Sequence, residues 1–269
     1  MILQDLHTHS KFDDGRGSLM AVAKSAEKLG LTSVGFSGHS PLPYEHDWSM
    51  TEESLRVYIK KGKAVKAKMR GRVDVLLGIE YDIISDIDLK DFDYVIGSVH
   101  HVKCGEEIIS DDESIELTEK IIDHFGSADK AAEAYFDLVG SFAENDRVDI
   151  IGHFDLITKF NERKKLFDTE SETYMAAAGE AMEKLVKAGK IFEINTGAMS
   201  RGYRTEPYPS KALLKELNAM GGKITITSDS HSPENLGYGF EQAKELALEC
   251  GFTEVWQLID GTFKPVKIK

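Results

Sequence analysis

Ile2-Leu3-Gln4-Asp5-Leu6 runs directly into His7-Thr8-His9 at the start of this 269-residue chain. The apolar character of residues 2–6 predicts a buried β-strand, and a strand places residues i and i+2 on the same face. We therefore expect His7 and His9 to project together from the carboxyl end of that strand. Two adjacent imidazoles form a natural first pair of metal ligands. Because a His-x-His pair also arises by chance, the interpretation depends on the later strands.

Six further segments have the composition of short buried strands, and each is followed by polar residues of a similar kind. These segments are residues 32–36, 73–79, 94–99, 148–152, 191–194 and 223–227, with a last short strand expected at 255–258. Apolar residues at helical spacing predict helices at 18–29, from 51 onward, and at 112–125, 127–144, 169–188, 209–220 and 240–250. Alternating strands and helices predict parallel βαβ units.

Polar side chains follow all seven clear strands, which favours a barrel over an open sheet. Barrel enzymes build their active sites at the carboxyl ends of the strands, whereas an open doubly wound sheet gathers its ligands mainly at one switch point. No internal repeat or low-complexity linker marks a domain boundary. We therefore predict an α/β fold, a barrel of about seven strands formed as a single domain by residues 1–269.

The composition narrows the partners and the compartment. A formal net charge of −13 argues against a nucleic-acid or anionic-membrane surface, which would need a basic face. Bound divalent metal could supply the local positive charge that an anionic substrate requires. Cys104 and Cys250 form no C-x-x-C pattern, and the chain lacks both an apolar leader and a run of eighteen apolar residues. We expect a reduced, cytoplasmic protein that is neither secreted nor inserted into a membrane.

Eight side chains of metal-ligand type follow the predicted strands, and a single zinc-like ion takes only about four ligands. They are His7, His9, His39, Glu80, His100, His153, Asp229 and His231. Two or three ions bridged by a carboxylate such as Glu80 would accommodate them, and Asp14 in a glycine-rich loop could add a ninth ligand.

Other histidines and acids are weaker candidates, because single histidines are more commonly hydrogen-bonded core or surface residues. His46, in a loop, and His124, on a helix, are not expected to bind metal. His101 should point away from the face of His100, where it would contact substrate or support a ligand. Asp5 is expected to orient a ligand from behind.

These motifs, in this order, resemble those of the polymerase-and-histidinol-phosphatase (PHP) superfamily, in particular its stand-alone histidinol-phosphatase branch. The matching segments are Asp5-Leu6-His7-Thr8-His9-Ser10, Asp14-Gly15, Gly38-His39-Ser40-Pro41, Gly78-Ile79-Glu80, Gly97-Ser98-Val99-His100, Gly152-His153 and Asp229-Ser230-His231. The resemblance implies a distorted (β/α)7 TIM-like barrel with a trinuclear metal site at its carboxyl-end rim.

The resemblance also implies three ligand sets and leaves the metal open among zinc, manganese and iron. The sets are His7, His9, Glu80 and Asp229 for one ion; Glu80, His100 and His153 for a second; and Asp14, His39 and His231 for a third. Asp13 competes with its neighbour Asp14 for the last set.

Clustered divalent ions lower the pKa of a bridging water and neutralise a phosphoester dianion, so hydroxide can attack phosphorus in line. With Glu80 as the bridge, Asp229 or His231 is expected to protonate the leaving oxygen. Arginines in the loops after ligand-bearing strands are candidates for bidentate phosphate binding. They are Arg201 first, then Arg163, with Arg16 and Arg204 in similar loops.

The expected activity is hydrolysis of a small phosphomonoester, with L-histidinol phosphate, an intermediate of histidine biosynthesis, as the leading substrate. The alternatives are a PHP phosphoesterase acting on phosphotyrosine, a nucleotide or an oligonucleotide end, and a non-catalytic module with vestigial ligands. A cyclic-amide hydrolase also uses His-x-His on its first strand, but it usually needs a carboxylated lysine, and no lysine ends a strand here.

Overall fold

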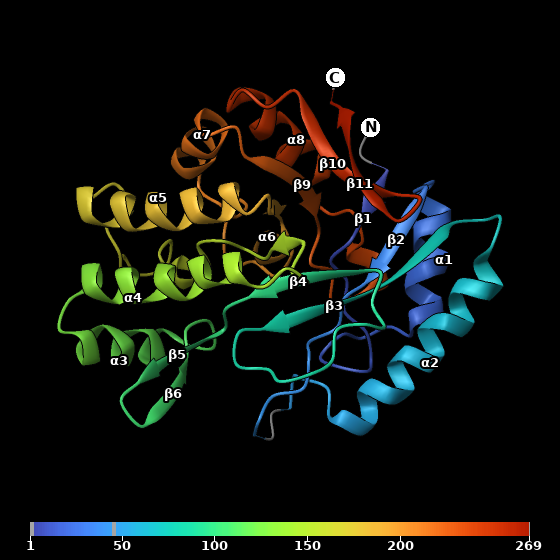
Figure 1. The fold of residues 1–269 in the computed structure, drawn as a ribbon, viewed down its shortest axis with the longest axis horizontal. Coiled ribbons are helices and arrows are strands. Elements are labelled where there is room, and N and C mark those ends of the chain that lie inside the picture. Colours follow the sequence, from blue (N-terminus) through green and yellow to red (C-terminus); the bar gives the residue numbers. More distant parts are fainter. Residues whose placement is uncertain (1–2, 45–46, 269) are drawn as a thin grey trace.

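A parallel seven-stranded sheet curls into a nearly closed barrel in the computed structural model, which describes residues 3–44 and 47–268 (Figure 1). The spatial order of its strands is β1-β2-β3-β4-β7-β8-β9, and every neighbouring pair is parallel. The strands are β1 (Gln4–Asp5), β2 (Ser33–Phe36), β3 (Asp74–Asp82), β4 (Tyr94–Ser98), β7 (Ile150–Ile151), β8 (Ile191–Asn195) and β9 (Lys223–Thr227). The distorted (β/α)7 prediction is thereby confirmed.

The helices surround the barrel, with α1 and α2 on one side and α4 and α5 on another (Figure 1). The α-helices are α1 (Leu19–Leu29), α2 (Glu52–Met69), α3 (Ile115–Phe125), α4 (Ala128–Ser141), α5 (Glu172–Lys187), α6 (Gly197–Ser200), α7 (Lys211–Ala219) and α8 (Phe240–Glu249). Short 3-10 turns are η1 (Phe142–Glu144), η2 (Leu156–Thr158) and η3 (Pro233–Asn235). Within the described residues, no helix combines the length and the apolar character needed to span a membrane.

Hydroxyl caps explain where the long helices begin. The side chains of Ser18, Thr51, Ser114, Ser127 and Ser171 each accept the backbone N–H three residues ahead, which satisfies a donor of the first helical turn. The helix predicted at 112–125 therefore starts only after Ser114. The helix predicted at 127–144 ends earlier than expected and continues as the 3-10 turn η1.

The barrel closes differently at its two ends. At the carboxyl end, the His9 N–H donates to the Ser230 carbonyl at 2.8 Å, which joins the chain after β1 to the chain after β9. At the other end, the Gln4 side chain exchanges two hydrogen bonds with the Leu258 backbone, at 2.8 and 3.0 Å. Leu258 lies in β10 (Glu254–Ile259), which pairs antiparallel with β11 (Thr262–Lys267). The strand expected at 255–258 is thus half of a hairpin.

A second hairpin, which the sequence pattern did not predict, is formed outside the barrel by β5 (His101–Cys104) and β6 (Glu107–Ser110). Its first strand begins directly at a candidate site residue, so periodicity alone did not separate it from the end of β4.

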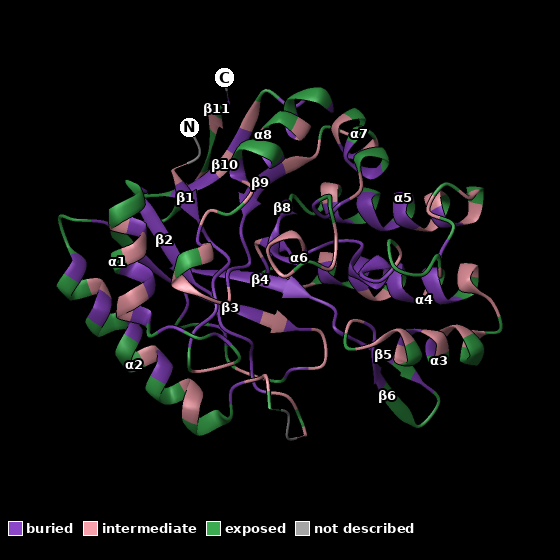
Figure 2. Cartoon of the chain, turned by 180° about the vertical axis from the view of Figure 1, so that it is seen from behind, coloured by how far each residue is buried: buried purple, intermediate pink, exposed green. Residues whose placement is uncertain are grey.

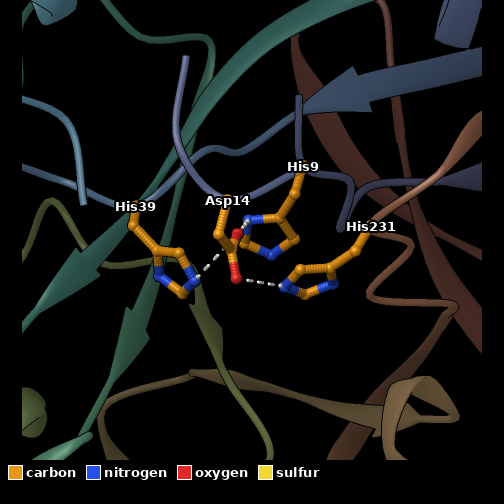
Figure 3. A group of neighbouring side chains, drawn as sticks. All are labelled: His9, Asp14, His39 and His231. Atoms are coloured by element: carbon orange, nitrogen blue, oxygen red, sulfur yellow. Dashed lines mark ion pairs between the residues drawn. The ribbon is translucent and has the colours of Figure 1, made fainter. Parts of the chain in front are cut away.

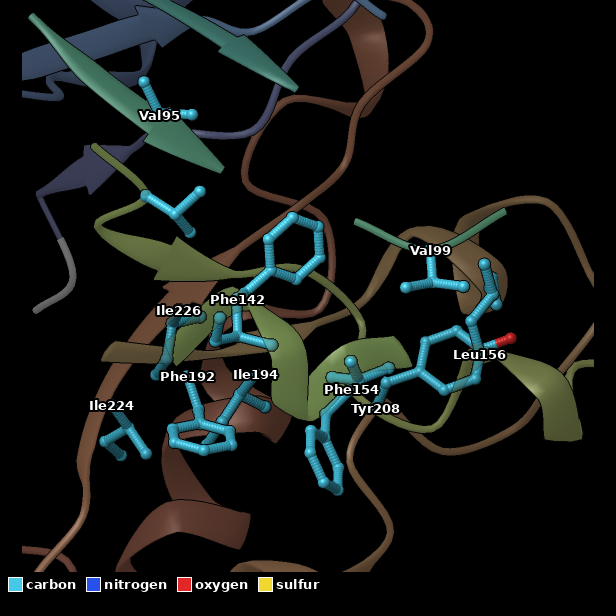
Figure 4. Close-up of a cluster of buried hydrophobic side chains, with 14 of the residues drawn as sticks. Val95, Val99, Phe142, Phe154, Leu156, Phe192, Ile194, Tyr208, Ile224 and Ile226 are labelled. Carbon is cyan, nitrogen blue, oxygen red and sulfur yellow. The ribbon is translucent and has the colours of Figure 1, made fainter. Parts of the chain in front are cut away.

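The strands of the barrel and the inner faces of the helices are largely buried (Figure 2). Apolar side chains pack between the sheet and the helices (Figure 4), and a second apolar cluster fills the amino-terminal part of the barrel, called the lower barrel below. Tyr94 occupies the barrel interior, and a Cβ added at Gly35 or Gly78 would lie 2.0 and 2.3 Å from its atoms. Those glycines are therefore needed for close packing against the ring. Apolar side chains thus fill the lower barrel, and the polar residues that follow the strands lie at the carboxyl-end rim.

Candidate metal centre

All nine side chains predicted to bind metal meet at the carboxyl-end rim of the barrel. They are His7, His9, Asp14, His39, Glu80, His100, His153, Asp229 and His231, and ion-pair distances connect them into one network. Most are buried, whereas Asp14 and His231 border the opening.

Glu80, near the end of β3, is the centre of this network. Its Oε2 atom lies 3.2 Å from His7 Nε2 and 2.9 Å from His39 Nδ1. Its Oε1 atom lies 2.9 Å from His153 Nε2 and 3.3 Å from His100 Nε2. Each carboxylate oxygen thus faces a different pair of imidazoles, which is the geometry required of a ligand shared by two ions.

Asp229 follows β9 with a positive φ of 46°, an uncommon conformation for a residue with a side chain. Its Oδ1 atom lies 3.1 Å from His9 Nε2, and its Oδ2 atom accepts a hydrogen bond from Arg201 at 3.1 Å. A Cβ at Gly197 would lie 2.5 Å from Asp229 Oδ2, so the start of α6 must be a glycine for this carboxylate to fit.

The outer part of the site consists of Asp14 and three imidazoles (Figure 3). Asp14 Oδ2 lies 3.1 Å from His231 Nε2, and Oδ1 lies 3.8 Å from His39 Nε2. Neighbouring Asp13 instead accepts hydrogen bonds from His9 Nδ1 at 2.6 Å and from the His39 N–H at 3.1 Å. Asp14 is therefore the acid that faces the open space, and Asp13 holds His9 from behind.

The donor set fits divalent metal. Three groups have ligand atoms within 4.8 Å of one another: His9, Asp14, His39 and His231; His7, His9 and Asp229; and His39, Glu80 and His100. The buried atoms His7 Nε2, His9 Nε2 and Glu80 Oε2 have no hydrogen-bond partner among the described residues. Imidazole nitrogens and carboxylate oxygens are both ligands of divalent metals, so a bound ion would pair these atoms. These groups overlap with the three ligand sets implied by the resemblance, although the group that contains Glu80 and His100 includes His39 and not His153, which lies 2.9 Å from the other oxygen of Glu80.

The pKa values of the buried imidazoles indicate that protons occupy the positions that a divalent cation would take. Burial lowers the pKa of His9, but Asp13 and Asp229 raise it overall to about 10. Burial likewise lowers the pKa of His7, and Glu193 and Glu80 raise it well above its ordinary value. The crowded carboxylates thus hold protons on these imidazoles, and a divalent cation would displace those protons.

Comparison with known proteins identifies the family. The PHP domain model matches residues 5–197, which includes most of the ligands just described. The chain belongs to the PHP domain family. It is accordingly a metal-dependent phosphoesterase of that family, similar to histidinol-phosphatases.

Curated relatives cover most of this PHP chain. A probable histidinol-phosphatase of Schizosaccharomyces pombe is 28% identical over 95% of this chain and 86% of its own length. The histidinol-phosphatase of Bacillus subtilis is 25% identical over 88% of this chain and 97% of its own length. The structure of a histidinol phosphate phosphatase from Lactococcus lactis superposes with a TM-score of 0.74 at 22% identity, covering 97% of this chain and 98% of that one. The last likeness confirms the fold.

Carboxylates behind the PHP ligands were largely missed from the sequence. Glu193 accepts a hydrogen bond from His7 Nδ1 at 2.9 Å, and Asp82 accepts one from His100 Nδ1 at 2.9 Å. Such partners fix the tautomer and orientation of a metal-binding imidazole. Asp82 follows Glu80 by two residues on the same strand, and that spacing was the available signal.

Asp5 supports the PHP site through backbone groups, including the N–H of His7 at 3.4 Å. Its buried carboxylate accepts the backbone N–H groups of Ser228 and Gly237, each at 3.1 Å. It therefore holds the loop that carries Asp229. Burial raises its pKa to about 6 even though these hydrogen bonds lower it.

The four candidate arginines occupy different environments. Arg201 lies at the metal centre, where it donates to Asp229 and contacts His231 Nδ1 at 2.5 Å. Arg163 is exposed, donates to the Gly202 carbonyl at 3.1 Å and stacks over Tyr203. The other two lie further away: Arg16 lines an outer pocket of about 410 Å³, and Arg204 turns inward to donate to Thr158 at 2.7 Å.

Lys159 is a cation of the site that sequence analysis did not single out. It follows η2 and lines a cavity of about 180 Å³ together with the ligands His100, His153 and Asp229. Its ammonium lies 3.0 Å from Asp112 and 4.6 Å from the Tyr203 ring centre. No pattern in the sequence marked it, because its direction depends on the short turn after β7.

The remaining histidines also differ in placement. His101 Nδ1 lies 3.3 Å from Asp82, the same carboxylate that holds His100, and its ring stacks on Trp48 at 5.6 Å. His124 packs edge-on against a phenylalanine on α3, and it belongs to no metal-binding group among the described residues. His46 lies outside the described residues.

Proposed function

We propose that this PHP protein is a histidinol-phosphatase, which hydrolyses L-histidinol phosphate to L-histidinol and inorganic phosphate in histidine biosynthesis. The observation that carries the proposal is the convergence of nine metal-binding side chains on a rim where Arg201 and Lys159 also face the same cavity. Relatives named histidinol-phosphatase cover most of the chain, and the similar Lactococcus lactis structure contains zinc, L-histidinol and phosphate.

Two or three divalent ions are the proposed cofactors. The residues that would hold them are the three ligand sets implied by the family resemblance, with Glu80 shared between two ions. These sets are His7, His9, Glu80 and Asp229; Glu80, His100 and His153; and Asp14, His39 and His231. When bound, such ions lower the pKa of water and neutralise the charge of a phosphate group.

The protein's own cations complement the phosphate. Arg201 is held against Asp229, and Lys159 is held against Asp112, so both positive groups are fixed before substrate arrives. A guanidinium can donate two parallel hydrogen bonds to phosphate, and an ammonium acts as a point charge. We assign Arg201 and Lys159 to the phosphate, with Arg163 and Arg16 further out.

Asp229 and His231 are the groups we propose for proton delivery to the leaving oxygen. Asp229 Oδ1 and His231 Nδ1 lie 3.5 Å apart beside Arg201, at the junction of the inner cavity and the outer pocket. A proton taken from the attacking water at this junction can be passed to the ester oxygen as it leaves.

The size of the site favours a small substrate. An inner cavity of about 180 Å³ adjoins an outer pocket of about 410 Å³. The two share four lining residues, which are Asp14, Arg201, Tyr203 and His231. The alternative is a PHP phosphoesterase acting on phosphotyrosine, a nucleotide or an oligonucleotide end, and the net charge of −13 disfavours the oligonucleotide.

Steady-state rates on a panel of phosphomonoesters test the proposal. The panel contains L-histidinol phosphate, phosphotyrosine, a nucleoside monophosphate and a 3′-phosphorylated oligonucleotide, and metal content is measured on the same sample. The highest kcat/KM is expected for L-histidinol phosphate. Preparations that contain metal but cleave another member of the panel best would overturn the substrate assignment and leave the PHP phosphoesterase assignment intact.

A further inference from the structure

Glu193, in the middle of β8, is a fully buried carboxylate with four hydrogen-bond donors around it. Its Oε2 atom accepts from His7 Nδ1 at 2.9 Å and from the Thr227 hydroxyl at 2.8 Å. Its Oε1 atom accepts from the His153 backbone N–H and the Asn195 side-chain amide, both at 2.7 Å. The donors come from the ends of β1, β7, β8 and β9.

The carboxylate determines which nitrogen of His7 carries the proton. An ionised carboxylate can only accept, so His7 Nδ1 must donate, and when a metal displaces the other proton the lone pair is left on Nε2. That Nε2 atom is buried and faces Glu80 at 3.2 Å and Asp229 at 3.8 Å. The hydrogen bond to Glu193 therefore prepares the nitrogen that faces the metal-binding carboxylates.

We propose that Glu193 is the positioning residue of the metal centre: it holds His7 in its metal-binding tautomer and holds the backbone of ligand His153 at the same time. The inference rests on the metal-dependent function proposed above. Glu193 lies behind the ligands and does not touch the substrate, so its effect should appear first in metal affinity.

Replacement by glutamine would conserve the shape of Glu193 but not its pattern of acceptors. If the amide nitrogen faced His7, Nδ1 would have to accept, and the proton would move to Nε2, where it blocks metal binding. If the amide nitrogen faced the other side, it would meet the His153 N–H, which is also a donor. Asn195 cannot reverse to relieve this conflict, because its Oδ1 accepts from the Gly197 N–H at 2.9 Å.

Aspartate would keep the charge of Glu193 and lose part of its reach. If the negative acceptor is what His7 needs, Glu193→Asp should retain more metal affinity than Glu193→Gln. If Glu193 only fills space, the isosteric glutamine should be the milder change. The order of the two variants therefore separates a positioning role from a structural one.

The experiment is a titration of metal-free protein with Zn²⁺ against a chromophoric chelator. Glu193→Gln is expected to weaken Zn²⁺ binding by at least about tenfold, the lower end of the range for loss of such a partner, and Glu193→Asp by less. Asp149→Asn is the matched control, because the partly buried Asp149 also accepts a backbone N–H of a barrel strand, from Val95 at 2.9 Å, but at the opposite end of the barrel. Its Zn²⁺ affinity should equal that of the wild type.

The outcomes separate the two proposals. Wild-type protein that binds less than one Zn²⁺ per chain would overturn the proposed function itself. Wild-type protein that binds Zn²⁺ normally, with Glu193→Gln equal to it or milder than Glu193→Asp, would overturn the role of Glu193 alone. If Glu193→Gln does not fold, ¹⁵N spectra of histidine-labelled, Zn²⁺-loaded wild type replace it: His7 should carry its proton on Nδ1, and an unprotonated Nδ1 would contradict the inference.

Discussion

At the scale of single residues, the stability of the metal centre depends on how the charges of its buried imidazoles and carboxylates compensate one another. Glu80 lies between ring nitrogens of His7 and His39 on one oxygen and of His100 and His153 on the other. Buried ionised groups at this density are stable only when opposite charges compensate them, by protons or by metal.

Glu80→Gln should remove the shared ligand and release two ions together. Activity is expected to fall by more than about 100-fold, beyond the loss seen when only a supporting partner is removed. Metal analysis and phosphatase rates on the same sample test this prediction. Glu180→Gln is the control, because Glu180 is exposed on α5. Near-normal metal content in Glu80→Gln would contradict the bridging role.

Arg201→Ala should lower kcat/KM by about 100- to 1,000-fold, the range for removing a preorganised donor at a developing charge. Arg201→Lys should recover part of this loss, because a lysine keeps the charge but not the paired donors. Arg163→Ala should change kcat/KM less, since Arg163 is exposed and already bonded to the Gly202 carbonyl. Equal effects of the two alanine variants would show that phosphate extends further outward than proposed.

Asp149 provides a prediction about pH and stability. Burial raises its pKa above the ordinary 3.8, despite the opposing hydrogen bond from Val95. A carboxyl whose pKa is higher in the folded state makes folding less favourable as pH rises from about 4 through its folded pKa. The free energy of unfolding of Asp149→Asn relative to wild type should therefore be greater at pH 7 than at pH 4. Urea unfolding at both pH values measures it, and an unchanged difference would contradict the burial effect.

At the scale of elements, the C-terminal hairpin completes the amino-terminal end of the barrel. The Gln4 side chain pairs with both the N–H and the carbonyl of Leu258, as a neighbouring strand would. The apolar residues of β10 then cover the lower barrel core, which includes Leu6 and Tyr94. This end lies opposite the metal centre.

Gln4→Ala should lower the free energy of unfolding by about 1 to 3 kcal/mol, because it leaves buried backbone groups of Leu258 unpaired. Metal content and kcat should stay close to wild type, since the change lies at the far end of the barrel. Chemical denaturation and activity measurements together test this separation. A large loss of metal with little loss of stability would show that the two ends are coupled.

At the scale of the whole molecule, the candidate ligands lie at or after the ends of six of the seven barrel strands, so we expect metal binding to stabilise the entire barrel. Removal of metal with a chelator should lower Tm, and restoring Zn²⁺ or Mn²⁺ should reverse the change. At 100 times the Kd, one bound ion stabilises the folded state by about 2.7 kcal/mol. Calorimetry with and without chelator measures this effect, and a Tm unaffected by either treatment would show that the barrel forms without its ions.

The barrel could be predicted from the sequence alone, and so could the convergence of the nine candidate ligand side chains, because two local rules govern both. A strand has a period of two, which aligns His7 with His9, and parallel strands that alternate with helices present their carboxyl ends on one rim. Each candidate ligand lies at or shortly after the end of one strand, so no knowledge of neighbouring strands was needed to find it.

Only the tertiary structure decided which groups support those ligands. Glu193 meets His7 because only β9 separates β8 from β1 around the nearly closed barrel, and Lys159 faces the cavity because a short turn directs it there. The Gln4–Leu258 pairing likewise joins residues separated by 254 positions. Contacts of this kind depend on the spatial order and direction of packed elements, which local periodicity does not specify.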